Sequence, residues 1–490
     1  MGRAEPIATR LFTVADQEKF AQLSGDRNPM HMNEVAARRT QAGSPVVHGV
    51  NALLWSLDYL VPRLPDYAKV LSLRVEFKKW IHVGKTVNSI LSEISENRAK
   101  VRLEVDGLSV AAISVCFDLA PMTDLCVSMS SWEPVTMPET ALEPDIAKLS
   151  ECAGIVGFAS VSDQIVSVWP NLARTIGPSA VAALVATSTL VGMNCPGLHS
   201  MYKELTVAFC STPFSGSTPG LVYKVETYDE RFRLARIHIE GRTVDQLLFT
   251  GTVRAVASLP PVKQPSIPDI SELISPNEFS RTCSLVVGGS RGLGELTAKV
   301  LVAGGGKVII TYAVGKAEAD RVQREILDAG GECEVMHYDV RSPAAEQLGG
   351  LGGRVTHLYY YATPTIFQSK GRLFAEDRFS LFVDFYLKSF FDLCNSVRRE
   401  AEGNIRIFYP SSVFVNERPQ DMTEYAMAKS AGEVLCADIN RFFGGVQVLI
   451  KRLPRMETDQ TASVIPVKKA DSVSILLPVI REMCAEDISV

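Results

Sequence analysis

Hydrophobic and polar positions alternate along the first part of the chain in a way that predicts an antiparallel sheet. An apolar helical run over about 50–60 comes first, and four runs with period-two alternation follow it. Gly or Asn separates the runs, which is typical of neighbouring strands joined by turns. We interpret residues 1–120 as one unit built from a helix and a sheet. Its predicted strands are 70–77, 86–91, 100–105 and 109–117.

The same order occurs a second time. Residues 121–150 have weak periodicity and several prolines, and we interpret them as a connector. An apolar helical run over 178–192 then precedes four more strand-like runs. A repeat of this size and order predicts a second helix-and-sheet unit over 151–258 that pairs with the first. Its predicted strands are 199–209, 221–227, 234–240 and 246–256.

The pattern changes after a proline-dense stretch. Residues 259–268 are stiff and poor in hydrogen-bond donors, and we predict a linker over 259–279. The apolar run Leu285-Val286-Val287 then leads into a glycine-rich turn, an apolar helical run and a second strand over 307–312. This βαβ order predicts a Rossmann-type, doubly wound parallel sheet over 280–490.

Composition argues against a nucleic-acid-binding, membrane or zinc-binding protein. The chain has 490 residues, which fits about three domains, and a net charge of −5, so it lacks the basic footprint of a nucleic-acid-binding protein. It has no long apolar run for a membrane span and no signal-peptide core, so we expect a cytoplasmic protein. The ten cysteines are scattered without metal-ligand spacing, and we expect reduced thiols and no metal site.

A carboxylate and an imidazole stand close together in Asp26-Arg27-Asn28-Pro29-Met30-His31, and His48-Gly49 opens the first predicted helix. A carboxylate and an imidazole can share the handling of a water molecule, one as base and one as acid. Free N–H groups at the helix start, near Gly49, can hold an enolate-like oxyanion. The alternative is a plain turn, because Gly, Asp, Asn and Pro are common turn formers. We expect His48 to pack or cap.

The run Phe20-Ala-Gln-Leu-Ser-Gly-Asp26 with Asn28-Pro29-Met-His31 and the later His48-Gly49 closely resembles the MaoC-like (R)-specific enoyl-CoA hydratases and 3-hydroxyacyl dehydratases of the hotdog fold. The resemblance covers about residues 8–120 and implies an α+β double hotdog for the two units. It also implies that Asp26 and His31 carry the chemistry and that the amide of Gly49 binds the thioester oxygen.

The second unit lacks the motif. Residues 168–177, where the acid and imidazole should precede the helix, contain no such pair. We expect a catalytically silent half that builds the dimer-like interface and the acyl tunnel, with residues 188–199 serving as structure or pocket wall.

The glycine-rich turn predicts nucleotide binding, with a purely structural turn as the alternative. Glycines let the backbone approach a pyrophosphate at a helix N-terminus. The second strand ends in Thr311-Tyr312-Ala313-Val314, without the acid that would bind the ribose of NAD, and Arg291 can meet a 2′-phosphate. We therefore expect NADPH. The turn residues expected to bind it are Gly288, Ser290, Arg291, Gly292, Leu293 and Gly294.

A third cluster carries proton chemistry. The predicted strand 405–412 ends in hydroxyls, and Tyr425-Ala-Met-Ala-Lys429 follows. Positions i and i+4 share a helix face, so we expect the charge of Lys429 to lower the pKa of the Tyr425 phenol. Such a phenol can protonate a carbonyl as hydride arrives from a nicotinamide.

Together with the glycine-rich turn, Ser412, Tyr425 and Lys429 strongly resemble the short-chain dehydrogenase/reductase family over about residues 280–460. The later Asp339-Val340 resembles its ketoacyl-reductase branch. The resemblance implies that Ser412 positions the substrate oxygen, Tyr425 is the acid/base and Lys429 also binds the ribose. It also places Asp339 and Val340 at the cofactor.

Several positions depart from the family pattern. Residues 360–363 read Tyr-Tyr-Ala-Thr instead of Asn-Asn-Ala-Gly, and Tyr386 replaces the asparagine that completes the proton relay. Arg455 follows Pro454 where the family has Pro-Gly, although Thr458 matches. These changes bear on the geometry of the nicotinamide pocket.

The reaction implied for the MaoC-like unit and the reaction implied for residues 280–460 are consecutive steps on an acyl thioester. We therefore predict a bifunctional enzyme of acyl-thioester metabolism. It would combine 3-hydroxyacyl dehydratase/enoyl hydratase activity with NADPH-dependent 3-oxoacyl reductase activity, on acyl-CoA or acyl-carrier-protein substrates. One alternative is an active hydratase with a degenerate, nucleotide-binding reductase domain. Another is a non-enzymatic acyl-carrier-binding scaffold. A homodimer is the preferred oligomeric state.

Overall fold

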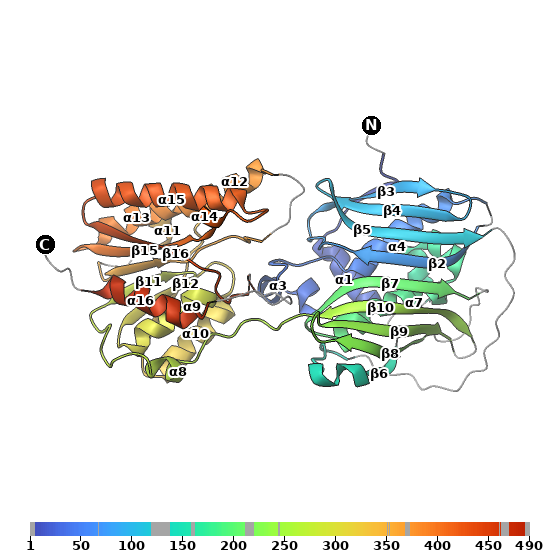
Figure 1. The fold of residues 1–490 in the computed structure, drawn as a ribbon, viewed down its shortest axis with the longest axis horizontal. Coiled ribbons are helices and arrows are strands. Elements are labelled where there is room, and N and C mark those ends of the chain that lie inside the picture. Colours follow the sequence, from blue (N-terminus) through green and yellow to red (C-terminus); the bar gives the residue numbers. More distant parts are fainter. Residues whose placement is uncertain are drawn as a thin grey trace. The chain divides into compact units, whose positions relative to one another are not determined.

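The computed structural model forms two compact units, Met1–Pro260 and Pro261–Val490 (Figure 1). The residues it describes are 5–66, 68–118, 138–157, 162–210, 220–243, 246–349, 351, 353–367, 373–459, 461 and 470–485. Most of the connector predicted at 121–150 lies outside these residues.

The first half of the N-terminal unit packs one long helix against five strands. The helix, α4, is buried along nearly its whole length. The shorter helices α1 to α3 precede it. The elements are β1 Ala8–Leu11, α1 Val14–Ser24, α2 Pro29–Met32, α3 Glu34–Arg38, α4 Gly49–Leu60, η1 Val61–Arg63, β2 Lys69–Phe77, β3 Thr86–Ile94, β4 Arg98–Val105 and β5 Leu108–Asp118.

The second half repeats this plan. Its central helix α7 is as deeply buried as α4 and runs on into a π-helical turn, η3. The elements are η2 Ile146–Glu151, β6 Ala153–Val156, α5 Ser162–Val168, α6 Pro170–Ile176, α7 Pro178–Thr189, η3 Leu190–Asn194, β7 Ser200–Phe209, β8 Gly220–Asp229, β9 Leu234–Arg242 and β10 Leu247–Ala257.

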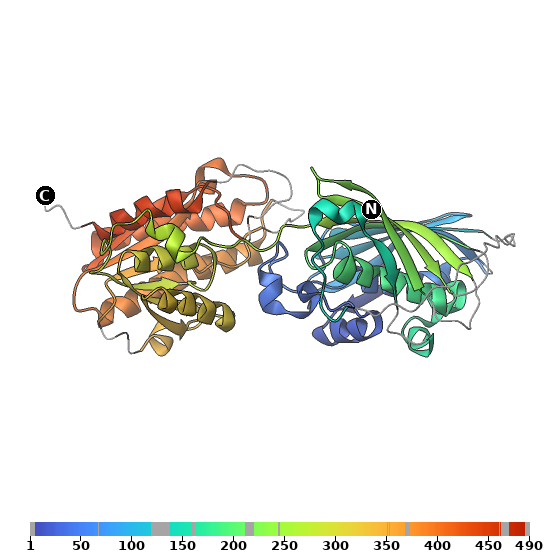
Figure 2. The same ribbon diagram turned by 90° about the horizontal axis from the view of Figure 1, so that it is seen from below.

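The two halves share one antiparallel sheet. Its ten strands have the order β1-β3-β4-β5-β2-β7-β10-β9-β8-β6, and each half contributes five neighbouring strands. β2 and β7 join the halves, with Val75 opposite Leu205. One hydrophobic core runs through both halves, and the helices gather on one face of the sheet (Figure 2). The predicted hotdog-like antiparallel fold is confirmed, although the sequence pattern missed the short edge strands β1 and β6.

The C-terminal unit is a six-stranded parallel sheet with helices on both faces. The strand order is β13-β12-β11-β14-β15-β16, which confirms the predicted Rossmann-like fold. The elements are α8 Ile267–Ser271, β11 Cys283–Val287, α9 Gly292–Ala303, β12 Lys307–Tyr312, α10 Lys316–Asp328, β13 Glu332–His337, α11 Ala344–Gln347, β14 His357–Tyr360, α12 Glu376–Val383, η4 Asp384–Lys388, α13 Ser389–Glu400, β15 Ile405–Ser412, α14 Phe414–Glu417, α15 Thr423–Phe442, β16 Val446–Leu453 and α16 Ser472–Cys484.

Alternate residues of these buried strands belong to two different cores. Leu285 and Val287 pack with α13 and α15, whereas Val286 packs with α9 and α16. Because strand side chains alternate between faces, the sheet is buried on both sides. The carboxyl ends of β11, β14 and β15 meet at one edge, where α/β folds bind ligands.

The predicted linker over 259–279 is shorter than the sequence pattern suggested. Helix α8 lies inside it and begins with a capping box in which Ser266 and Asp269 bond to each other's backbone N–H groups. Ile267 and Ile270 are buried in the core beneath α9 and α16. This part of the stretch therefore belongs to the C-terminal unit, because its apolar residues have a core to pack against.

Among the described residues, no single helix has the length and apolar character to cross a membrane. The bent pair Pro170–Ile176 and Pro178–Asn194 meets that test of length and composition only when the two helices are taken together.

Candidate active sites

Local turn chemistry fixes the loop that carries Asp26. Helix α1 ends at Gly25, whose φ of 77° is the left-handed conformation that glycine adopts most readily. The Ser24 hydroxyl then accepts a hydrogen bond from the backbone N–H of Asp26 at 3.0 Å. Two residues later, Asn28 caps α2 by accepting from the N–H of Met30, and Pro29 takes the first helical position. The turn chemistry thus presents a carboxylate and an imidazole at a break between two helices.

The Asp26 carboxylate is 1% exposed, and each of its oxygens accepts a hydrogen bond. Oδ1 accepts from the backbone N–H of Asn28 at 3.1 Å, and Oδ2 accepts from the hydroxyl of Ser188 at 2.7 Å. Burial raises the pKa of Asp26, while the nearby His31 charge and these hydrogen bonds oppose the rise. A carboxyl group tuned toward neutrality is suited to exchanging a proton with substrate or water.

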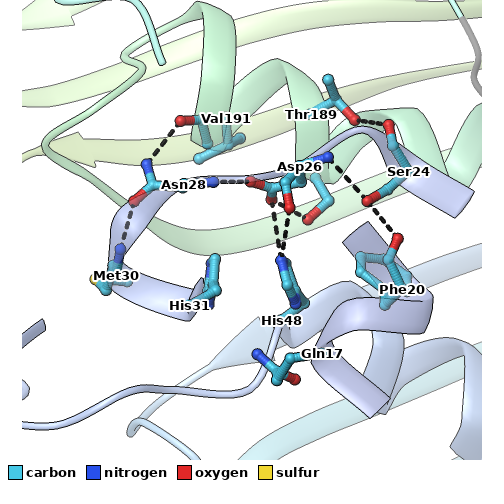
Figure 3. Close-up of polar contacts among 12 residues, drawn as sticks. Gln17, Phe20, Ser24, Asp26, Asn28, Met30, His31, His48, Thr189 and Val191 are labelled. Atoms are coloured by element: carbon cyan, nitrogen blue, oxygen red, sulfur yellow. Dashed lines mark hydrogen bonds and ion pairs between the residues drawn. The ribbon is translucent and has the colours of Figure 1, made fainter. Parts of the chain in front are cut away.

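His31 is half-buried and held in one orientation. Its Nδ1 lies 2.7 Å from the backbone oxygen of Val46. A carbonyl oxygen can only accept, so Nδ1 carries a proton and Nε2 is left for proton transfer. The ring stacks on that of His48, with the two centroids 3.9 Å apart (Figure 3).

His48 holds the backbone of the loop that carries Asp26. Its Nε2 lies 3.1 Å from the backbone oxygen of Asp26 and 3.9 Å from Oδ2. Complete burial and the His31 charge hold the pKa of His48 well below its ordinary value. His48 is therefore a neutral donor to the Asp26 carbonyl, which agrees with the expected packing role.

Asp26, His31 and His48 could in principle bind a metal, because their ligand atoms lie within 4.8 Å of one another. However, imidazole lone pairs lie in the ring plane, and two stacked rings direct them side by side and not toward one point. His48 also uses Nε2 on the Asp26 carbonyl. The geometry fits proton transfer better than metal coordination.

Gly49 begins helix α4 immediately after His48. The first N–H groups of a helix have no intrahelical acceptor, so the Gly49 amide can bind an incoming oxygen. A Cβ added at Gly49 would lie 3.0 Å from the ring of Phe77. The close approach of this ring explains why glycine stands at this position.

In the C-terminal unit, the glycine-rich turn packs tightly on one side and is open on the other. A Cβ at Gly294 would lie 2.3 Å from the backbone oxygen of Gly288, and Gly288 has a φ of 79°. Gly292 also has a positive φ, of 58°, but its Cβ would meet nothing within 4 Å. The open side at Gly292, at the start of α9, is where a phosphate group could approach. Ser290 is buried, and Leu293, in the first turn of α9, packs against the core.

Two residues expected at the cofactor form ion pairs within the protein. Arg291 Nη1 lies 3.4 Å from Oδ2 of Asp459. The Asp339 carboxylate binds the guanidinium of Arg341 through both oxygens, which lowers the pKa of Asp339. Val340, beside it, is buried in the core next to α13. A cofactor phosphate at Arg291 would have to compete with Asp459.

Ser412, Tyr425 and Lys429 lie together, as the sequence predicts. The Ser412 side chain lowers the pKa of Tyr425, but burial dominates and raises that pKa to about 12. The expected lowering of this pKa by Lys429 is wrong for this structure. Lys429 Nζ lies 6.0 Å from the Tyr425 ring centroid and donates to the Pro410 carbonyl at 2.7 Å. Burial lowers the pKa of Lys429 itself to about 7.

Aromatic side chains enclose Lys429. Its Nζ lies 3.8 Å from the ring centroid of Tyr386 and 4.9 Å from that of Tyr409. The Tyr386 hydroxyl bonds to that of Thr363 at 2.6 Å. The Tyr360 hydroxyl donates to the backbone oxygen of Phe385. Two residues that depart from the family pattern, Tyr386 and Thr363, are thus hydrogen-bonded to each other in this site.

Sequence reasoning assigned residues 188–199 to structure or pocket wall and did not predict that Ser188 and Gly192 contact Asp26. Ser188 bonds to the carboxylate although 162 residues separate the two in sequence. The one available signal is the Thr187-Ser188-Thr189 run, three buried hydroxyl residues that follow seven apolar residues, 180–186, of the same helix.

Comparison with known families matches both units. Residues 3–110 match the MaoC like domain family, and residues 282–464 match the short chain dehydrogenase family. A 3-hydroxybutyryl-CoA dehydratase of Methylorubrum extorquens is 32% identical over 100 residues, or 20% of this chain and 64% of that protein. A 3-oxoacyl-[acyl-carrier-protein] reductase of Synechocystis is 44% identical over 57 residues, or 12% of this chain and 23% of that protein.

The chain therefore spans less than two thirds of the length of either relative. Among solved structures, a 3-oxoacyl (acyl-carrier-protein) reductase from Agrobacterium tumefaciens with NADP bound matches at 22% identity and a TM-score of 0.34. The match covers 37% of this chain and 76% of that one.

Proposed function

We propose that this chain, which joins a MaoC-like dehydratase domain to a short-chain dehydrogenase/reductase domain, is a bifunctional acyl-thioester enzyme. The first activity is the interconversion of a 3-hydroxyacyl and a trans-2-enoyl thioester. The second is the NADPH-dependent reduction of a 3-oxoacyl thioester. The grouping of the Asp26 carboxylate with the His31 imidazole within 4.8 Å is the observation that carries the first activity.

In hydration, water oxygen bonds to C3 of the enoyl chain and a proton goes to C2. Asp26 and His31 share the two proton transfers, one taking a proton from water and the other giving one to carbon. Negative charge develops on the thioester oxygen between these steps. The N–H of Gly49, at the N-terminus of α4, is placed to stabilise that charge.

In reduction, bound NADPH supplies hydride to the 3-oxo carbon. The open Gly292 and the tight packing at Gly294 fit the approach of a pyrophosphate to the start of α9. Arg291 would face the 2′-phosphate. Tyr425 donates its phenolic proton to the carbonyl oxygen, and Ser412, whose side chain interacts with that phenol, orients the oxygen.

A second candidate function keeps the hydratase and makes the C-terminal domain a cofactor-binding module with little turnover. The contact of Tyr386 with Lys429 supports it, because a lysine that is only 5% exposed exchanges protons with solvent slowly and so returns a proton to Tyr425 slowly. A non-enzymatic scaffold is disfavoured, since a scaffold has no need of Asp26, His31, Tyr425 and Lys429.

The substrate is an acyl-CoA or an acyl chain on a carrier protein. We also propose a homodimer formed through the helices of the reductase unit. Three large apolar side chains on α13 and α15 support this, since Phe391, Val434 and Phe442 are exposed.

The test uses the full chain with two assays. NADPH absorbance is followed with acetoacetyl-CoA, and hydration is followed with crotonyl-CoA, each for wild type, Asp26→Asn and Tyr425→Phe. The bifunctional proposal predicts both reactions, with each variant losing only its own by about 10²- to 10⁴-fold. Hydration without NADPH consumption, even with longer or carrier-bound substrates, would favour the second candidate. If Asp26→Asn keeps wild-type hydration activity, the role of Asp26 is wrong.

A further inference from the structure

We propose that Ser188 and Gly192, from the half without the catalytic motif, are positioning residues that hold the Asp26 carboxylate in its working orientation. The inference rests on the proposed hydratase function. It gives the second half, which has no acid/imidazole pair of its own, a direct part in the chemistry of the first.

Ser188 fixes one carboxylate oxygen. Its hydroxyl donates to Oδ2 of Asp26 at 2.7 Å, and both side chains are buried, at 5% and 1% exposure. A hydrogen bond to a carboxylate in a water-poor site is stronger than one between neutral groups and favours the ionised form. Ser188 therefore stabilises the carboxylate in the state that can accept a proton.

Gly192 supplies the space for the other oxygen. A Cβ at this position would lie 2.5 Å from Oδ1 of Asp26, so no larger residue fits without moving the carboxylate. Gly192 lies in the π-helical turn η3, which widens the end of α7 and exposes backbone carbonyls. One of these, the carbonyl of Gly192, accepts from Nδ2 of Asn28 at 2.7 Å.

A third contact ties the same helix to the start of the Asp26 loop. The Thr189 hydroxyl donates to the backbone oxygen of Ser24 at 2.5 Å (Figure 3). Contacts from α7 and η3 therefore meet the loop at Ser24, Asp26 and Asn28. Loop and helix end form one rigid unit, as precise positioning of a catalytic group requires.

The charged and polar groups around Asp26 determine how its pKa should change in a variant. Within the described part of the chain, the titratable groups that face its carboxylate are His31 and His48. The His31 charge, the Ser188 hydroxyl and the Asn28 amide all favour ionisation against the burial that opposes it. Removing the Ser188 hydroxyl takes away one of the contacts that lower the pKa of Asp26, whereas burial still raises it. Asp26 would therefore ionise only at higher pH.

The experiment compares Ser188→Ala with a matched control, Ser56→Ala. Ser56 is a buried serine of α4 whose hydroxyl bonds to that of Ser89 at 2.8 Å, away from Asp26. In Ser188→Ala, the acid limb of kcat/KM for crotonyl-CoA hydration should move up by about one pH unit. The rate on the plateau should fall by about ten- to a hundredfold. Ser56→Ala should show neither change.

A second variant tests the space at Gly192. Gly192→Ala should lose hydration by at least about a hundredfold while circular dichroism and NADPH oxidation stay as in wild type. Wild-type hydration in Gly192→Ala, or an unmoved acid limb in Ser188→Ala, would overturn the inference.

A readout that needs no turnover separates this inference from the proposed function. The seven histidines can be labelled at Cε1, and the ionisation of Asp26 will appear as a step in the NMR titration of His31. Ser188→Ala should move that step to higher pH. If wild type fails to hydrate any enoyl thioester, the proposed function is wrong, and an unmoved step in Ser188→Ala would independently overturn the inference.

Discussion

The ring of Tyr386 lies against the ammonium group of Lys429, with Nζ 3.8 Å from the ring centroid. Tyr386 is itself almost completely buried and is fixed by the bond between its hydroxyl and that of Thr363. The contact provides a cation–π attraction but takes space that water would otherwise occupy next to Nζ. Lys429 is left with the Pro410 carbonyl as a hydrogen-bond acceptor. The rate of the reductase reaction should depend on this contact.

Tyr386→Asn should accelerate reduction. The smaller side chain opens a polar space beside Nζ, where a water can bond to the lysine, to the new amide and to solvent, so that a proton can be returned to Tyr425. We expect NADPH oxidation with acetoacetyl-CoA at pH 7 to rise by at least about tenfold. Tyr386→Phe is the control, because it keeps the ring over Nζ. Equal rates in both variants would show that the ring does not limit turnover.

Lys429→Met should change how stability depends on pH. The pKa of Lys429 is about 7 in the folded protein and near its ordinary 10.5 when unfolded. Between these values the unfolded chain binds a proton that the folded chain does not, so this group makes stability rise with pH through that window. The wild-type rise, relative to Lys429→Met, should begin near pH 7 and level off near pH 10.5.

Two optical signals together assign the effect to the C-terminal unit. All four tryptophans lie in the N-terminal unit, so tryptophan fluorescence follows that unit and far-ultraviolet circular dichroism follows both. Urea unfolding should therefore show the pH-dependent difference in the dichroism transition alone. Parallel stability curves for wild type and Lys429→Met would mean that the lysine is hydrated in the folded protein.

Asp459→Asn should tighten binding of NADPH and leave binding of NADH unchanged. The carboxylate of Asp459 pairs with Arg291 at 3.4 Å and would compete with a 2′-phosphate for the guanidinium. Asparagine keeps an oxygen for the N–H of Val262, which Asp459 now accepts. We expect the Kd for NADPH, measured by fluorescence titration, to fall several-fold. Arg291→Leu is the opposite control and should weaken NADPH alone. A similar change for both cofactors would exclude Arg291 from phosphate recognition.

The sequence predicted the parts of the sites that depend on short-range chemistry. Asp26, Asn28 and His31 lie in one loop whose turn and cap residues determine its shape, so their proximity follows from local rules. Tyr425 and Lys429 share a face of α15 for the same kind of reason. The alternating strands likewise predicted the sheet of each half.

Contacts between distant segments could not be predicted in this way. Ser188 meets Asp26 because β2 and β7 join the two halves in one sheet, and the hydroxyl run around Ser188 does not identify a carboxylate partner. The direction of the Tyr425 pKa was missed for a related reason. Spacing placed Lys429 nearby, but burial, which depends on the surrounding rings from η4 and β15, decides both pKa values.

Gly49→Ala should reduce hydration by displacing the amide that we propose binds the thioester oxygen. The new Cβ would lie 3.0 Å from the Phe77 ring, so the ring and the start of α4 must move apart by a few tenths of an ångström. Loss of one oxyanion donor costs about 10²- to 10³-fold in kcat, and a small shift should cost somewhat less. The double variant Gly49→Ala/Phe77→Leu removes the ring and should recover part of the lost kcat. The kcat of Phe77→Leu alone is the value with which the double variant is compared. If the double variant is as slow as Gly49→Ala, the methyl group blocks the substrate directly and the position of the amide is not the cause.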